Sequence, residues 1–128
     1  MAIRVVRLGQ PRKPGEGLRL GTVRFPPRGV AKSRYASENW YDVWMPDLAP
    51  SPATVKFAHA AKTETQWKAY GRRYRKEMSA PERRRLLDLL AALSKHADFS
   101  VGCYCEDERR CHRTILKSLL KERGARLA

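Results

Sequence analysis

The sequence has no hydrophobic run near the roughly 20 apolar residues that a membrane-spanning helix needs. The stretch from Met1 to Val6 lacks the apolar centre of a secretion signal. Internal repeats, low-complexity stretches and linkers are also missing from the 128 residues. These absences exclude a helical membrane protein and a repeat array. We expect one cytoplasmic domain over residues 1–128, with no membrane partner and with an oligomeric state that the sequence leaves open.

Cysteines and acidic residues are scarce. The three cysteines are odd in number and lie close together, which excludes the disulfide framework of a small secreted domain and favours reduced thiols. Thirteen acidic residues against 27 Lys and Arg leave a net charge of +14. Such a charge favours anionic partners, namely nucleic acid, nucleotides or phosphorylated metabolites, although it also fits a solvated basic surface.

Three segments have the composition of β-strands. They cover residues 3–8, 18–24 and 99–105. The first two flank a loop rich in proline and glycine, so they are candidates for an antiparallel pair.

Helix-start signals precede three further segments. Ser51-Pro52 fits an N-cap followed by a first-turn proline. Two capping boxes follow, Thr63 to Gln66 and Ser79 to Glu82. The last helix is expected from Cys111 to about Arg123. The fold class is therefore α/β: a single small three-layer domain with a mixed sheet of about three strands flanked by helices.

The segment from Phe99 to Arg113 gathers all three cysteines beside His112. Its Cys-x-Cys and Cys-His pairs offer the donors of a tetrahedral zinc site. Adjacent residues of a helix, however, point about 100° apart, which argues against Cys111 and His112 sharing one ion. We therefore expect no metal and no cofactor.

The thiols leave three other possibilities open. Cys103 starts a Cys-x5-Arg string that ends at Arg109, as in thiol phosphatases, but Glu106, Asp107 and Glu108 would repel phosphate. Cys105 and Cys111 bracket a short loop and would form a redox disulfide if their side chains converge. Alternatively, Cys103 and Cys111 are small buried hydrophobic residues.

A second basic element follows the second expected strand. It reads Arg24-Phe-Pro-Pro-Arg28-Gly-Val-Ala-Lys32 and could bring three cations to one anion. The clustered Trp40, Tyr41, Trp44 and Met45 are expected to pack in the core or to cover a sheet edge.

The order of these motifs resembles a known family. The motifs are Leu20-Gly-Thr-Val-Arg-Phe-Pro-Pro-Arg-Gly-Val-Ala-Lys32, Trp44-Met-Pro-Asp-Leu-Ala-Pro-Ser51, Trp67 to Tyr74, and Cys103-Tyr-Cys-Glu with Cys-His-Arg113. They look like the domain of unknown function 488 family, which includes the YeaO-like proteins. The chain is more similar to the cysteine-bearing members, because the YeaO branch lacks the Cys-His-Arg element. The resemblance implies a small cytoplasmic α/β domain and brings no established reaction.

We expect the site where the strands ending near Arg24 and Cys105 finish side by side. The leading hypothesis is a pocket for a phosphorylated or nucleotide-like ligand. Its residues are Cys105 as candidate nucleophile, His112 as candidate acid or base, and Arg24, Arg28, Lys32 and Arg113 as candidate anion-binding groups. The alternative is a non-catalytic nucleic-acid-binding accessory protein that acts through its basic surface.

Overall fold

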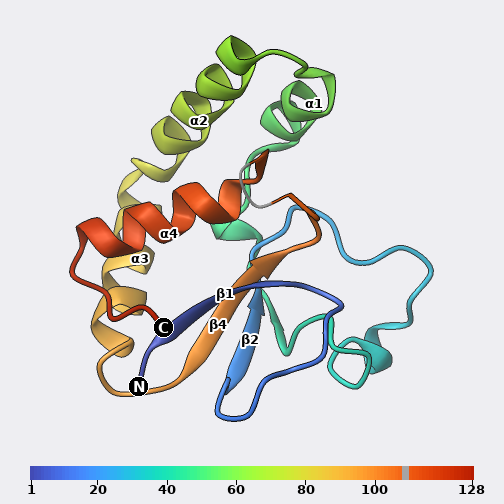
Figure 1. Ribbon diagram of the computed structural model, residues 1–128, viewed down its shortest axis with the longest axis vertical. Coiled ribbons are helices and arrows are strands. Elements are labelled where there is room, and N and C mark those ends of the chain that lie inside the picture. The colour runs from blue at the N-terminus through green and yellow to red at the C-terminus, as the bar shows by residue number, and fades with distance from the viewer. Residues whose placement is uncertain (108–109) are drawn as a thin grey trace.

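A computed structural model describes residues 1–107 and 110–128 of the chain. The elements follow in the order β1 (Ile3–Arg7), β2 (Leu18–Gly21), the 3-10 turn η1 (Lys32–Arg34), β3 (Val43–Trp44), the 3-10 turn η2 (Pro46–Leu48), α1 (Pro52–Ala60), α2 (Glu64–Met78), α3 (Pro81–Leu93), β4 (Phe99–Cys103) and α4 (His112–Glu122). The expected α/β class is confirmed, and Figure 1 shows the helices gathered beside and above a small sheet.

The sheet is parallel throughout, so the prediction of a mixed sheet of about three strands is wrong. Its four strands have the order β1-β4-β2-β3. β4 lies between β1 and β2 and runs parallel to both, which also rules out the antiparallel pair expected for the first two segments. Every residue of β4 is buried, as is typical of a central strand in a parallel sheet.

Two of the predicted helix starts are confirmed and one is wrong. Ser51 caps α1, and Thr63 forms a complete capping box with Gln66 at the start of α2. α3 instead begins after Ala80, which makes no side-chain cap. The reason is that Pro81 takes the first helical position, while the Ser79 hydroxyl donates to the carbonyl of Lys76 in the preceding helix.

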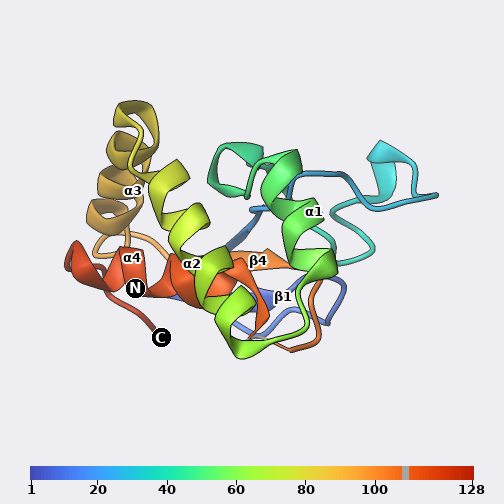
Figure 2. The same ribbon diagram turned by 90° about the horizontal axis from the view of Figure 1, so that it is seen from above.

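Helices and irregular chain cover opposite faces of the sheet. Figures 1 and 2 show α2, α3 and α4 on one side. The main core lies there, where Val101 of β4 packs with Leu116 and Leu120 of α4. The other face carries a smaller cluster around Leu8, Val23 and Tyr41. α1 stands above the carboxyl ends of the strands (Figure 1).

A buried arginine holds the irregular layer in place. Arg19 of β2 is 1% exposed, and its guanidinium pairs with the equally buried Glu16. The same guanidinium donates to the backbone carbonyls of Gln10 and Asn39 at 2.8 and 2.7 Å. One side chain thus ties the loop after β1 to the segment before β3.

The prediction that residues 40–45 pack in the core or cover a sheet edge is confirmed for Tyr41, whereas Trp44 is exposed. Tyr41 is buried against Gly21 of β2, where an added Cβ would lie 2.2 Å from the Tyr41 ring. Trp44 lies in the short edge strand β3 and is 44% exposed. Within the described part of the chain, no helix is both long and apolar enough to cross a bilayer.

Candidate functional site

A cavity of about 990 Å³ opens at the carboxyl ends of the parallel strands. Gly21 of β2 pairs with Gly102 of β4, so these two strands finish side by side. The bend at Pro26 and Pro27 and the turn at Tyr104 and Cys105 line the same hollow. The predicted meeting of these two segments is confirmed, at the edge of the sheet where α/β proteins usually bind ligands.

The polar lining of the cavity is strongly basic. It contains four arginines, Arg7, Arg24, Arg28 and Arg110, and none of its described residues is a carboxylate. The Arg7 guanidinium already has partners at the rim of the cavity: it forms an ion pair with Glu106 and donates to the carbonyl of Tyr104. Arg28 has no ion-pair partner among the described residues. No motif of the sequence marks Arg7 or Arg110 as lining residues, because only the fold brings them to the cavity.

Aromatic rings form much of the remaining wall. Five aromatic residues line the cavity: Phe25, Trp40, Trp67, Tyr70 and Tyr104. Trp67 and Tyr70 of α2 pack edge to face, with ring centroids 5.5 Å apart. The guanidinium of Arg110 lies over the Trp67 ring at 5.7 Å, which is within the range of a cation–π contact.

Two of the four predicted anion-binding residues line the cavity, and the other two, Lys32 and Arg113, do not. Arg24 and Arg28 line the cavity, but Arg24 donates to the carbonyls of Pro46, Ala49 and Pro50 and so holds the turn before α1. Lys32 lies on η1 and is not part of the lining.

Arg113 is buried and does not belong to the cavity lining. Its side chain is 5% exposed, and its Nε has no hydrogen-bond partner among the described residues. It is close enough to Cys105 to lower the pKa of that thiol in part. Arg113 therefore adds positive potential to this end of the cavity without lining it.

Cys105 is the free thiol of the structure and lies exposed at the cavity rim. Protein atoms around the sulfur still desolvate it in part, and this burial raises its pKa above the ordinary value. Arg113 and Arg7 oppose the shift without reversing it. Thiol nucleophiles usually have a lowered pKa, so the electrostatics around Cys105 do not favour a thiolate at neutral pH.

His112 is buried at the first position of α4. Its Nε2 lies 2.6 Å from the backbone carbonyl of Thr22 and donates to it, which joins α4 to the end of β2. Burial lowers the pKa of His112 to about 4 and outweighs the hydrogen bond to Thr22, while Arg113 adds to the lowering. The imidazole is therefore neutral near pH 7, with Nδ1 as its acceptor.

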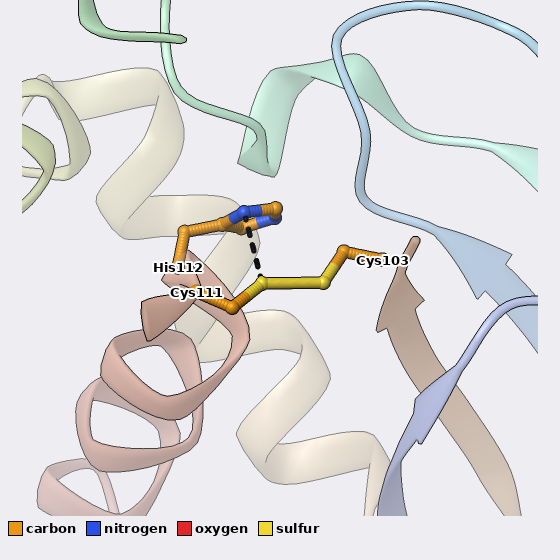
Figure 3. Close-up of side chains that lie close together, drawn as sticks. All are labelled: Cys103, Cys111 and His112. Atoms are coloured by element: carbon orange, nitrogen blue, oxygen red, sulfur yellow. Dashed lines mark hydrogen bonds between the residues drawn. A yellow bond between two sulfur atoms is a disulfide. The ribbon is translucent and has the colours of Figure 1, made fainter. Parts of the chain in front are cut away.

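The disulfide of the structure joins Cys103 and Cys111 (Figure 3). The pairing of Cys105 with Cys111, which the sequence left open, is not the one formed, and Cys105 is free. Cys103 at the end of β4 points toward α4, whereas Cys105 lies beyond the strand at the rim. The phosphatase string loses support because Cys103 is buried and bonded, while Glu108 and Arg109 lie outside the described residues.

The expectation that Cys111 and His112 point too far apart to share one ion also starts from a wrong premise. It treats Cys111 as helical, yet Cys111 is the N-cap of α4 and has extended backbone, with φ −144° and ψ 148°. The angle of about 100° between successive helical side chains therefore does not apply to Cys111 and His112. The donor atoms of Cys103, Cys111 and His112 all lie within 4.8 Å of one another.

Residues 3–124 match a protein-family model that is described as the active DUF488-N3 subclade. No curated protein and no solved structure matches the chain. The family match agrees with the resemblance carried by the Pro-Arg-Gly and Cys-His-Arg motifs.

Proposed function

Because the chain belongs to the active DUF488-N3 subclade and has a basic cavity at the carboxyl ends of its strands, we propose that it binds a phosphorylated, nucleotide-like ligand there. The description calls the subclade active and names no reaction. The residues that line the cavity of this chain indicate the ligand class.

The observation that carries the proposal is the composition of the lining. Arg7 is paired with Glu106 and Arg24 with backbone carbonyls, whereas Arg28 lines the cavity without an ion-pair partner among the described residues. An anion entering the cavity would therefore find the Arg28 guanidinium as a donor. The aromatic rings offer flat surfaces on which a base can stack. An arginine-rich lining together with aromatic walls suits a nucleotide better than a simple sugar or a lipid.

The individual residues have different roles in this proposal. Arg28 contacts the phosphate directly, because it lines the cavity and has no described ion-pair partner. Arg110 and Trp67 form the stacking side. Arg24 holds the turn before α1, and the buried charge of Arg113 adds positive potential near the ligand.

The catalytic assignments of Cys105 and His112 stay predictions. Both residues line the cavity, which supports a place near the ligand. The raised pKa of Cys105 and the neutral state of His112 give neither an activated thiolate nor a general acid near pH 7. Binding is therefore the part of the proposal that the geometry supports best.

Calorimetric titration with AMP, ADP, adenosine and inorganic phosphate tests the proposal. We expect saturable binding of the nucleotides, and weaker binding of adenosine because it lacks the phosphate. Arg28→Ala should weaken nucleotide binding by about 10- to 100-fold, since charge-assisted hydrogen bonds contribute roughly 1.5–3 kcal/mol.

Lys32→Ala is the matched control. Lys32 is an exposed cation in the same segment but outside the cavity lining, so we expect nucleotide affinity within about twofold of the parent protein. Absence of saturable binding by any probe would overturn the proposal. An equal loss of nucleotide affinity in Arg28→Ala and Lys32→Ala would also overturn it, because the ligand would then respond only to the overall positive charge of the protein.

One observation favours a second function, that of a nucleic-acid-binding accessory protein. The net charge of +14 is large for 128 residues. Lys68 and Arg72 of α2 are exposed cations that could neutralise the phosphates of a single strand. Phosphate contacts of this kind would need neither Cys105 nor the cavity.

A further inference from the structure

The buried cluster of Cys103, Cys111 and His112 has a chemistry that ligand binding in the cavity does not use. Two sulfur atoms and an imidazole nitrogen lie within 4.8 Å of one another, and all three side chains are buried. Figure 3 shows the sulfurs of Cys103, at the end of β4, and Cys111, at the start of α4, joined to each other, with the His112 ring beside the Cys111 sulfur. Cys103 and His112 also border the cavity, so the cluster is reachable from it.

The hydrogen bond of His112 sets the nitrogen that faces the sulfurs. Because Nε2 donates to the carbonyl of Thr22 at 2.6 Å, the proton is on Nε2 and Nδ1 carries the lone pair. Nδ1 lies 3.8 Å from Cys111 Sγ. A backbone carbonyl that holds the distal N–H of a histidine is the usual outer contact of a metal-binding imidazole.

The backbone spacing of the two cysteines suits a shared ion. Their Cα atoms lie 7.8 Å apart, whereas disulfides usually join Cα atoms about 4.4–6.8 Å apart. Two thiolates bound to one zinc ion, each at about 2.3 Å in tetrahedral geometry, keep their sulfurs roughly 3.8 Å apart. The wider backbone separation thus fits a metal-bound pair.

We propose that Cys103, Cys111 and His112 bind one zinc ion when the two cysteines are reduced, with the fourth coordination position open toward the cavity. Two thiolates and one imidazole are the donor set of a zinc site that keeps a place for water or a ligand. A closed structural site would need a fourth protein donor, and no such donor joins this group among the described residues.

The Cys103–Cys111 disulfide has to be reduced before the ion binds. A cellular dithiol supplies two electrons: its thiols close into their own disulfide while the Cys103–Cys111 bond opens into two thiols. Both thiols then lose their protons as the sulfurs bind the ion. Oxidised and metal-bound forms therefore exclude each other. The proposal goes beyond anion binding and does not depend on it.

The first test uses the unaltered protein in two redox states. One sample is reduced with a phosphine under argon and freed of the reductant, and the other is left oxidised. Zinc is then titrated into both against a chromophoric chelator. We expect one ion per reduced chain and none per oxidised chain. If the reduced, folded protein binds no zinc, or if the oxidised protein binds it equally well, the proposal is overturned.

Cobalt substitution and three variants identify the ligands. Reduced protein with Co²⁺ should show thiolate-to-cobalt absorption, at roughly half the intensity in Cys103→Ser. His112→Asn should lower zinc affinity by at least about 10- to 100-fold. Cys105→Ser is the matched control and should bind like the parent protein. Equal zinc binding by Cys103→Ser, His112→Asn and the parent would contradict the assignment.

Circular dichroism and nucleotide titration of each variant keep the two proposals separate. A folded Arg28→Ala protein that loses nucleotide and keeps zinc supports the metal site on its own. Because the redox comparison needs no substitution, a variant that fails to fold leaves the test intact.

Discussion

At the scale of single residues, Glu77 of α2 joins two helices. Its carboxylate accepts hydrogen bonds from the Ser51 backbone N–H at 2.9 Å, from the Ser51 hydroxyl at 2.6 Å and from the Thr54 hydroxyl at 2.8 Å. Burial alone would raise the pKa of Glu77, but these hydrogen bonds outweigh it, and the pKa is lowered. The ionised form therefore stabilises the packing of α1 against α2.

Glu77→Gln should lower the free energy of unfolding by about 1–2 kcal/mol at neutral pH, because the amide accepts fewer of these hydrogen bonds. Since the pKa is lower in the folded state, the stabilisation is present above the unfolded pKa of about 4.3 and is lost as the pH falls through the folded value. Urea unfolding of both proteins at pH 7 and pH 3 measures the difference, which should shrink at pH 3.

Glu122→Gln is the control for this prediction. Glu122 pairs with Arg75 on the surface, and exposed pairs of this kind contribute less than about 1 kcal/mol. If Glu77→Gln lowers the free energy of unfolding by the same amount at pH 7 and pH 3, then the charge of Glu77 does not stabilise the fold.

The pattern of residues along the chain predicts which side chains are buried better than it predicts which of them meet at one site. The apolar strand composition of residues 99–105 is enough to place Cys103 inside, and it is 1% exposed. The sequence does not predict how closely the His112 ring approaches the Cys111 sulfur, because this distance depends on whether the backbone of Cys111 is helical or extended. Helix boundaries predicted from sequence are uncertain by one or two residues. Here the assignment of Cys111 to the helix or to the N-cap decides whether its sulfur can lie near the His112 ring.

At the scale of elements, the buried pair of Arg19 and Glu16 connects the sheet to the irregular layer. The two side chains are 1% and 2% exposed. Arg19→Met leaves the Glu16 carboxylate buried without a partner and removes the donors to Gln10 and Asn39. We expect a loss of about 3–5 kcal/mol, as for other broken buried pairs, measured by urea unfolding.

The double variant Arg19→Met with Glu16→Leu should recover part of that loss, because no unpaired carboxylate remains. Arg19→Met should also weaken nucleotide binding, since Gly9, Gln10 and Trp40 line the cavity and the loop that carries Gly9 and Gln10 is held by Arg19. A single variant that costs less than about 1 kcal/mol would show that the irregular layer does not need this pair.

Local signals predict the helices of this chain and not the order of its strands. Capping residues mark the starts of α1 and α2 because a cap is a contact between near neighbours. The placement of β4 between β1 and β2 joins segments some 80 to 96 residues apart, and no local pattern encodes it. β3 consists only of Val43 and Trp44, too short for an alternation to be visible.

At the scale of the whole molecule, the site follows from the topology. Parallel strands place all their carboxyl ends at one edge, so the loops after β1, β2 and β4 meet there whatever their sequences. The sequence therefore predicts the position of the cavity from the ends of two strands, near Arg24 and Cys105. It does not predict the wall from α1 and α2, because His59 and Trp67 reach the cavity only through helix packing.

The net charge of +14 leads to a last prediction, which separates the two candidate functions. An accessory protein should bind a short single-stranded oligonucleotide with an affinity that falls steeply with salt. Each lost phosphate contact should reduce the slope of log affinity against log salt by about 0.7. Lys68→Gln with Arg72→Gln removes two exposed cations of α2 and should reduce the slope by about 1.4, as measured by fluorescence anisotropy.

The variants of the cavity complete this comparison. Cys105→Ser and Arg28→Ala should leave oligonucleotide binding nearly unchanged if the outer surface binds the strand, because neither residue belongs to α2. If AMP displaces the oligonucleotide and Arg28→Ala abolishes its binding, then the strand enters the cavity and the two candidate functions are one. If no oligonucleotide binds at low salt, the accessory function is excluded, since phosphate attraction is strongest under that condition.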